Sequence, residues 1–506
     1  MKRLMILVMA AICISLCAGV AYAAPSVKIT DRKDNVTVQE RVTAEILAEI
    51  KKGVDATKDL TFTVEKVRSV ESFANLCEAF PNMKSLSIIA EDELTSIAPV
   101  AKLKNMTRFL LRGGTVTDFS PLSELTGLTS LQLEGTSNKN GMMAPDLKWM
   151  SKLTNLTYLT IGAPSGLGTL VSFEGIPAAL KVTSVSIKGA APADMTPLQA
   201  LSGLKKIDLM GSTIADLTPL VKLPELDEVN LYGATVKDFS PLAACAKLQK
   251  VNYYATKDSD YSTLGALTQV RELQGGLTKL ADISWVANLP NLKKFNVFSE
   301  KVTDYTPLGK VKVEDFTIWK MDKPVDVKQL ADATSLTRLK LWNLDETTGF
   351  EGLGALVNLK ELIIDGVNSK KGTVDLASTK SLANVETLEL TESNFVNTKG
   401  LEGLGKLKKA TVSKANKVGD TPFDLAFLAK TPELETLSIT DSKISNLDAV
   451  AKCEKLKSVT LVKIDGLTSL AAIKKLPNLQ SVTVSKDAFP EAELSGFGGK
   501  VKVNQR

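Results

Sequence analysis

Apolar residues recur along most of this chain in one short pattern, which predicts a single repeated unit instead of several different domains. The pattern is apolar-x-x-apolar-x-apolar, as in Leu204-x-x-Ile207-x-Leu209, Leu226-x-x-Val229-x-Leu231 and Leu434-x-x-Leu437-x-Ile439. If units are numbered by their second apolar residue, about 18 of them run from 86 to 482, mostly 22 or 23 residues apart. A period of this length over such a distance predicts one solenoid of stacked units.

Alternation within each unit predicts one β-strand. Val229 and Leu231 are expected to point into the core, whereas Glu228, Asn230 and Tyr232 should point outward. Later in the unit a Ser or Thr precedes a proline, as in Ser240-Pro241, and we expect that hydroxyl to cap a short helical turn. Leucines such as Leu242 would then close the core from the opposite side.

The second half of the unit carries a family resemblance. It stands at Val116-Thr-Asp118-Phe-Ser-Pro121-Leu122, Ile214-Ala-Asp216-Leu-Thr-Pro219-Leu220 and Val302-Thr-Asp304-Tyr-Thr-Pro307-Leu308, and similar units cover roughly residues 60 to 490. These units resemble the bacterial leucine-rich repeats of the 22-residue class typified by internalins. The resemblance implies an α/β solenoid: a horseshoe with a parallel β-sheet on its concave face and short 3-10 or irregular segments on its convex face. It also implies a protein that binds a partner and is not an enzyme.

Two departures from that family change what can be inferred. The family usually places Asn five residues after the second leucine. This chain instead has Ser212, Ala234, Thr256, Glu300, Ser393 and Ser442 there, so we expect a weaker, hydroxyl version of the polar ladder. The immunoglobulin-like module and cell-wall anchor common in internalins are not visible. For that reason the family's architecture and binding mode are carried over, and its role in cell entry is not.

The first residues predict export. Met1-Lys2-Arg3 is basic, Leu4 to Val20 is largely apolar, and Ala21-Tyr22-Ala23 offers small residues to a signal peptidase. We expect residues 1–23 to be a signal peptide and the mature chain to be secreted, surface-bound or periplasmic. A retained transmembrane anchor is the alternative interpretation of this run. No second run of spanning length occurs, so no membrane span is expected in the mature chain.

The remaining chain divides into a cap, an array and a second cap. Residues 24–64 are predicted to form an N-terminal cap, with an amphipathic helix over Thr37 to Lys52 covering a first strand near Leu60 to Val64. Residues 65–488 would hold the repeats and 489–506 a C-terminal cap. Such caps protect the open edges of a sheet, so their role is structural.

Composition excludes several classes of function. The chain has no histidine, which removes the commonest general base and every histidine-containing metal site. The net charge of +5 gives no reason to propose nucleic acid, and neither a phosphate loop nor a metal-spaced cysteine pair is found. We expect a monomer without cofactor or metal. Cys77, Cys245 and Cys453 are expected to be free, buried thiols.

One stripe of outward strand positions is unusually aromatic. The third residue after the numbered position is Tyr232, Tyr254, Gly276, Phe298, Trp319 and Trp342 in six consecutive repeats. The candidate partner-binding residues are this stripe and its outward neighbours: Tyr232, Tyr254, Phe298, Trp319, Trp342, Asn230, Asn252, Asn296, Arg338 and Lys340. Aromatic and arginine side chains dominate binding energies, so recognition of a protein on the concave face is the leading hypothesis. The alternative is that these aromatics only stack across the sheet.

Other functions stay open. The same stripe would suit a cell-surface glycan, and a purely structural envelope scaffold would have no soluble ligand. Nearer the C-terminus the outward positions turn to hydroxyls, which could meet glycan or ordered water or serve only solubility: Thr387, Thr391, Thr411, Ser413, Thr436, Ser438, Thr440, Ser458, Thr460, Ser481 and Thr483. Inserted loops at Ser137 to Ala144 and Asn368 to Thr373 would extend a site along one edge.

Overall fold

The computed structural model describes residues 27–55, 57–135, 146–162, 172–178, 180–298, 300–370, 372–416, 421–486, 488–497 and 501–506. The predicted signal peptide at 1–23 and the predicted loop at Ser137 to Ala144 lie outside these residues.

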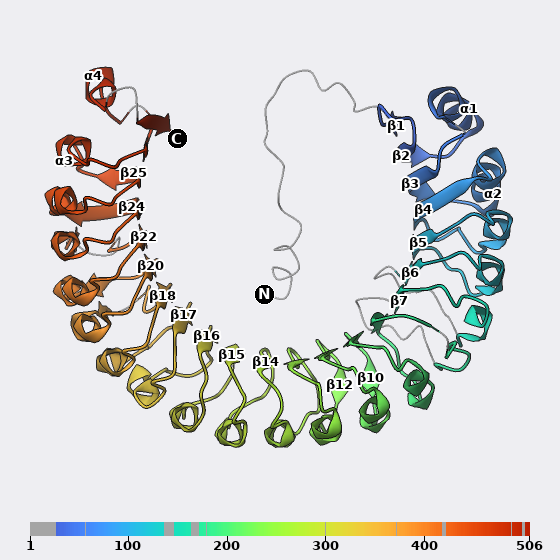
Figure 1. Ribbon diagram of the computed structural model, residues 1–506, viewed down its shortest axis with the longest axis horizontal. Coiled ribbons are helices and arrows are strands. Elements are labelled where there is room, and N and C mark those ends of the chain that lie inside the picture. Colours follow the sequence, from blue (N-terminus) through green and yellow to red (C-terminus); the bar gives the residue numbers. More distant parts are fainter. Residues whose placement is uncertain are drawn as a thin grey trace.

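The chain winds through one repeat after another into a horseshoe (Figure 1). Strands line the inner, concave face, and short helical turns line the outer, convex face. The predicted leucine-rich-repeat solenoid is confirmed, because every unit contributes one strand to the same sheet and buries its leucines only against its neighbours.

The concave sheet follows the chain order, and only its first pair, β1 with β2, is antiparallel. Across the sheet its strands are β1 (Val27–Ile29), β2 (Asn35–Arg41), β3 (Leu60–Val67), β4 (Met83–Ala90), β5 (Arg108–Gly113), β6 (Ser130–Glu134), β7 (Tyr158–Gly162), β8 (Ser184–Lys188), β9 (Lys206–Asp208), β11 (Glu228–Asn230), β13 (Lys250–Asn252), β14 (Glu272–Gln274), β15 (Lys294–Phe298), β16 (Asp315–Trp319), β17 (Arg338–Trp342), β18 (Glu361–Asp365), β20 (Thr387–Thr391), β22 (Lys409–Ser413), β24 (Thr436–Ser445), β25 (Ser458–Asp465), β26 (Ser481–Val484) and β27 (Lys502–Gln505).

Short strand pairs flank this sheet where the chain turns away from the concave face. They are β10 (Thr213–Ile214) with β12 (Thr235–Val236), β19 (Val374–Asp375) with β21 (Phe395–Val396), and β23 (Phe423–Asp424) with the far end of β24.

The convex face is built mainly of single 3-10 turns. These are η1 (Ala98–Lys102), η2 (Ser120–Glu124), η3 (Lys148–Met150), η4 (Thr196–Ala200), η5 (Thr218–Lys222), η6 (Ser240–Ala244), η7 (Tyr261–Ala266), η8 (Ser284–Asn288), η9 (Thr306–Lys310), η10 (Val327–Leu330), η11 (Phe350–Ala355), η12 (Ala377–Ser381), η13 (Thr398–Gly403), η14 (Ala426–Lys430) and η15 (Leu447–Lys452). The α-helices are α1 (Ala44–Gly53), α2 (Val70–Ala79), α3 (Ala471–Lys474) and α4 (Glu491–Ser495).

The helix predicted at Thr37 to Lys52 begins later than expected. Residues Asn35–Arg41 form β2, and α1 starts only after Thr43, whose hydroxyl accepts a hydrogen bond from the Ile46 amide at 3.3 Å. The prediction began the helix at Thr37, inside the segment Asn35-Val36-Thr37-Val38, where apolar and polar residues alternate as in a strand. The N-terminal end therefore holds two more strands than the sequence suggested.

The cap of each 3-10 turn is also different from the predicted one. The Ser or Thr before proline makes no capping hydrogen bond; the aspartate two residues earlier does, as Asp238 accepts from the Ser240 amide at 2.7 Å. The same contact recurs at 2.7–2.9 Å at Asp118, Asp194, Asp216, Asp282 and Asp304. In an Asx turn the aspartate oxygen accepts from the backbone amide two residues later, which explains why aspartate recurs there.

The polar ladder behind the sheet is built largely of hydroxyls, as predicted. The Ser212 hydroxyl accepts from the Ala190 amide at 3.0 Å, and the Ser393 hydroxyl accepts from the Val367 amide at 2.9 Å. Two buried asparagines, Asn368 and Asn416, add paired bonds to the backbone of the preceding repeat. The three cysteines are buried and free, which confirms that prediction.

Candidate functional site

Strand register brings the predicted aromatic stripe together on one face. Asn230 pairs with Asn252 and Asn252 with Gln274, and the row continues through Asn296 and Thr317 to Lys340. One step along the strands, Phe298 pairs with Trp319 and Trp319 with Trp342. Because each unit repeats the same strand, residues some 22 positions apart become neighbours across a strand spacing of ~4.8 Å.

The five aromatic side chains stack on one another in order along the solenoid; we call them the aromatic ladder (Tyr232, Tyr254, Phe298, Trp319 and Trp342). Ring centroids lie 5.1 Å apart for Tyr232 and Tyr254, 5.6 Å for Tyr254 and Phe298, 3.7 Å for Phe298 and Trp319, and 4.3 Å for Trp319 and Trp342. Their planes are within 17° of parallel. The geometry is compatible with both interpretations of the stripe, a binding surface and stacking across the sheet, since the rings stack and also lie on the concave face.

Stacking decides which parts of the rings are accessible. Phe298 is only 1% exposed between its neighbours, whereas Tyr232 at the end of the ladder is 37% exposed. The Lys340 ammonium covers the last ring, with its Nζ 3.8 Å from the Trp342 centroid. Inner rings therefore have their faces covered and present their edges to the concave space. Phe298 supports this surface and offers a partner little of its own side chain.

A pair of glycines makes the ladder continuous, which sequence reasoning did not anticipate. A Cβ on Gly276 would lie 2.7 Å from both Tyr254 and Phe298, so the missing side chain lets those two rings close across one repeat. On the inward side a Cβ on Gly275 would lie 2.0 Å from Tyr253, whose buried ring fills the vacant core position. The sequence did carry a signal, because Gly275 stands at an inward strand position where the neighbouring repeats have an apolar residue such as Leu231, Tyr253 or Val297.

A buried acidic group lies beneath the middle of the ladder. Glu300 is fully buried; its Oε2 accepts from the Thr278 hydroxyl at 2.8 Å, and its Oε1 has no hydrogen-bond partner among the described residues. The hydroxyl of Tyr253 is likewise buried and unpartnered. Burial, with a smaller contribution from nearby Asp322, raises the pKa of the Glu300 carboxyl to about 7 against the opposing effect of the Thr278 hydrogen bond.

The amides beside the ladder hold the strand ends. Asn230 and Asn252 each accept from the backbone amide two residues on, Tyr232 and Tyr254 respectively, at 3.1 and 3.0 Å. Asn296 donates through Nδ2 to the Gly275 carbonyl at 2.7 Å. These side chains position the aromatic residues and still leave polar atoms at the concave surface.

A row of alternating charges, which we call the charged row, borders the amides on the other side. It consists of Lys206, Glu228, Lys250, Glu272, Lys294, Asp315, Arg338 and Glu361. Its members neutralise one another: Lys206 with Glu228 at 2.9 Å, and Arg338 with Asp315 at 2.9 Å and Glu361 at 3.2 Å. The predicted site residue Arg338 is thus engaged in ion pairs within the sheet.

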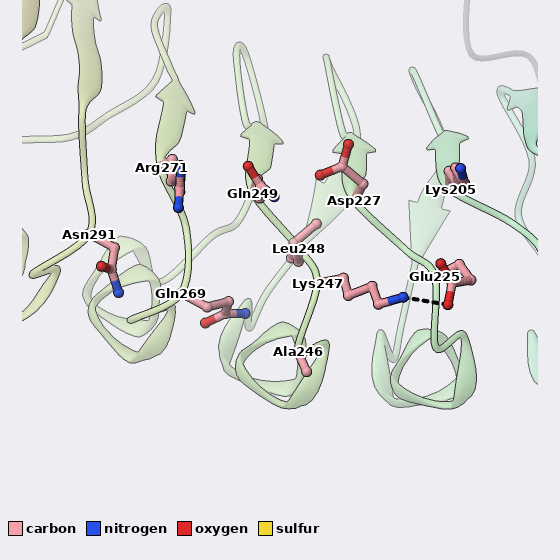
Figure 2. Close-up of a pocket in the computed structure, with 10 residues that line it drawn as sticks. All are labelled: Lys205, Glu225, Asp227, Ala246, Lys247, Leu248, Gln249, Gln269, Arg271 and Asn291. Carbon is pink, nitrogen blue, oxygen red and sulfur yellow. Dashed lines mark hydrogen bonds and ion pairs between the residues drawn. The ribbon is translucent and has the colours of Figure 1, made fainter.

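A polar pocket of about 480 Å³ lies on the flank where the chain returns from the convex turns to the strands (Figure 2). Figure 2 shows two tiers of side chains: Arg271, Gln249, Asp227 and Lys205 near the strands, and Asn291, Gln269, Lys247 and Glu225 nearer the turns. Lys247 pairs with Glu225 at 2.5 Å, and Gln269 donates to the Leu242 carbonyl at 2.9 Å. Three of the polar groups that line this pocket are therefore already engaged with one another or with the backbone.

The predicted hydroxyl array is also in register. Thr411, Ser438, Thr460 and Thr483 form one row on β22, β24, β25 and β26. Beside it, Thr440 donates to Ser413 at 2.7 Å and Ser481 to Ser458 at 3.0 Å. The array is half-buried and carries no aromatic residue.

Within the described ranges, no group of three or more acidic or cysteine side chains is placed to hold a metal ion. The same residues include no helix with the length and apolar character needed to cross a membrane.

No family model and no curated protein sequence matches this chain. Several solved structures are similar to it. An internalin from Listeria monocytogenes is 20% identical over 73% of this chain and 85% of its own, with a TM-score of 0.41. A leucine-rich-repeat protein from Leptospira interrogans is 13% identical over 84% and 91%, with a TM-score of 0.45.

A third similar structure is a chain of the Toll–Spätzle complex of Drosophila, 12% identical over 92% of this chain and 65% of its own, with a TM-score of 0.53. Similarity at this level concerns the fold. Together with the stacked single-strand units and the leucine core, the similarity to this third structure shows that the chain has the leucine-rich-repeat horseshoe fold.

Proposed function

We propose that this protein is exported and recognises a protein partner through the concave surface formed by the aromatic ladder and the amides beside it. The observation that carries the proposal is the stacked ladder itself, which crosses six repeats on the concave face. Aromatic residues in the centre of a surface, surrounded by polar groups, are typical of binding hot spots.

Ring geometry favours a protein over a glycan. A sugar packs its C–H groups against the electron-rich face of an aromatic ring, but the inner faces of this ladder are occupied by neighbouring rings. The ring edges, which carry partial positive charge, remain accessible and suit carbonyl oxygens, carboxylates and the faces of aromatic side chains. A protein surface supplies all three of these groups.

The charged row supports specificity more than affinity. Because its ion pairs are already formed, a partner gains little by contacting them, and half-exposed pairs of this kind contribute about 0–1 kcal/mol. They would instead reject a partner that placed an unpaired charge opposite them.

The test replaces Trp319 and Trp342 with alanine in the mature chain. The partner is first identified by mass spectrometry after capture on the wild-type protein, and its affinity is then measured by surface plasmon resonance. We expect at least about 30-fold weaker binding, since a hot-spot truncation costs about 2 kcal/mol. The lost stacking should also lower the free energy of unfolding by about 1–2 kcal/mol.

The matched control is Phe295→Leu with Phe316→Leu, because these rings stack at 5.8 Å in the same region on the inward side of the sheet. It should cost at least as much stability and leave the affinity unchanged. Unaltered binding by the tryptophan variant, or equal loss in both variants, would contradict the proposal. Selective binding to a glycan array that is lost with the tryptophans would replace the protein partner with a glycan.

A further inference from the structure

A row of lysines lies along the edge of the aromatic ladder, where the strands end and the chain turns toward the convex face. Lys257, Lys279 and Lys301 each follow three residues after a ladder position, namely Tyr254, Gly276 and Phe298. All three are exposed, and backbone bonds to the preceding repeat place two of them, since the Lys257 amide donates to the Ala234 carbonyl and the Lys301 amide to the Leu280 carbonyl, each at 2.9 Å. We call these three residues the lysine row.

The two borders of the concave surface differ in charge. On the far side, the cations of the charged row are held in ion pairs, as Lys250 and Lys294 share Glu272 at 3.5 and 3.3 Å. Among the residues that the structure describes, no ion pair is formed by any member of the lysine row. Three exposed cations in neighbouring repeats therefore have no ion-pair partner within the described residues.

A pocket of about 580 Å³ opens beside two members of the lysine row. Its lining includes Lys257, Lys279, the hydroxyl-bearing Ser259 and Leu277, a leucine that is 38% exposed. Leu277 adjoins the ladder, because its amide donates to the Phe298 carbonyl at 2.8 Å. One acidic side chain, Asp258, is part of this lining. The pocket thus combines an apolar floor with positive charge.

We propose that the segment of the partner bound at this edge is an acidic peptide stretch that also carries aromatic or aliphatic side chains. Its carboxylates would lie opposite the lysine row, and its apolar side chains would lie in the pocket at Leu277 and against the ring edges. This inference rests on the proposed protein-binding function and adds the chemistry of the partner.

Charge complementarity of this kind acts mainly on the rate of association and on salt dependence. Side chains at the rim are screened over about 8–10 Å at physiological ionic strength, so the lysine row should matter most at low salt. The ladder contributes through burial of apolar surface and should matter at any salt concentration.

A defined probe allows the test before the natural partner is known. We would measure binding of a random copolymer of glutamate and tyrosine by fluorescence anisotropy, at low salt and at high salt. Polyglutamate, a copolymer of lysine and tyrosine, and heparin serve as comparison probes. The test variant is Lys257→Gln/Lys279→Gln/Lys301→Gln.

The matched control variant is Lys222→Gln/Lys310→Gln/Lys430→Gln. These exposed lysines end three convex 3-10 turns, η5, η9 and η14, so the change in net charge is the same but lies on the opposite face. We expect the lysine-row variant to bind the acidic aromatic copolymer about ten-fold more weakly at low salt and with a weaker salt dependence, while the control variant binds like the wild type.

Equal loss in both triple variants would overturn the proposal, since the effect would then come from net charge alone. Binding of heparin or polyglutamate as tight as that of the copolymer would also overturn it, because the apolar side chains would contribute nothing. If Trp319→Ala/Trp342→Ala abolished binding of the natural partner and the lysine-row variant left it intact, only this inference would fail. The reverse result, with the lysine-row variant alone losing the partner, would refute recognition by the ladder.

Discussion

The repeats that carry the aromatic ladder, β11 to β17, and the hydroxyl-bearing repeats, β20 to β26, have the same backbone and different surfaces. In both regions each strand pairs in parallel register with the next, and the inward positions are fully buried. The outward positions are stacked rings in one region and threonine and serine hydroxyls in the other. The solenoid is therefore insensitive to what its concave face displays, which leaves that face free to acquire a binding surface.

The interior also differs between the two regions. Behind the hydroxyl-bearing strands, Ser393, Asn416 and Ser442 all bond the backbone of the preceding repeat. Behind the ladder, Tyr253 and Glu300 each have a buried polar atom without a partner in the described structure. Orphaned buried polar groups cost stability and are uncommon, so the ladder region gives up some stability that the hydroxyl region keeps.

The largest expected effect comes from restoring an ordinary core residue at the glycine pair. In Gly275→Val the new Cβ would overlap the Tyr253 ring, which is fully buried and has no free space to enter. We expect a loss of about 3 kcal/mol in the free energy of unfolding, measured by urea denaturation.

Adding Tyr253→Leu to that variant should recover much of the loss, because the pair would then match the usual repeat, in which Leu231 occupies the position of Tyr253. A double-mutant cycle gives the coupling energy. Additive losses would show that the ring and the glycine do not compensate each other. That result would also mean that the core of the ladder region is packed no differently from the core of the hydroxyl-bearing region.

A smaller effect is expected from the buried carboxyl. Burial raises the pKa of Glu300 from 4.5 to about 7 in the folded chain, so the folded state binds a proton more tightly than the unfolded state. The stability that this proton contributes is fully present below pH 4.5 and is lost as the pH rises through about 7. The free energy of unfolding of Glu300→Gln should therefore rise relative to that of the wild type by about 2 kcal/mol between pH 5 and pH 8.

The absence of histidine makes this measurement direct, because no histidine titrates in the same pH range. Exposed Glu351→Gln is the control for loss of a carboxyl group and should leave the pH profile of unfolding unchanged. If the difference in the free energy of unfolding between Glu300→Gln and the wild type did not change with pH, burial would have no effect on the ionisation of Glu300.

The smallest effect should come from the hydroxyl row. Thr411→Ala and Thr460→Ala lie at half-buried outward positions where neither hydroxyl makes a hydrogen bond within the described structure. Each should change stability by no more than about 0.5 kcal/mol and should leave binding of the partner unaltered. Lost binding would move the recognition surface from the ladder to the hydroxyl-bearing strands.

Much of the site could be foreseen from the sequence because the repeat converts spacing into position. Residues such as Tyr232, Trp319 and Trp342 are one repeat or several repeats apart, and a fixed period places them on one stripe whatever the details of packing. The same reasoning could not assign exposure within the stripe. Phe298 is covered on both faces by its neighbours, and this follows only from the tilt of adjacent rings.

Other errors arose where two local signals compete. Ser240 and Asp238 are both suitable caps, and backbone geometry selects the aspartate. The alternating residues of β2 run directly into the helical pattern of α1, and only pairing with β1 and β3 shows where the strand ends.

The amino-acid sequence alone specified the number, spacing and inward face of the repeats, because periodic leucines can be buried in only one stacked arrangement. Three features depended on the tertiary structure: the stacking of the ladder, the filling of the Gly275 space by Tyr253, and the burial of Glu300. Each involves side chains from two or three different repeats, so its energy depends on distances that no single unit of sequence contains.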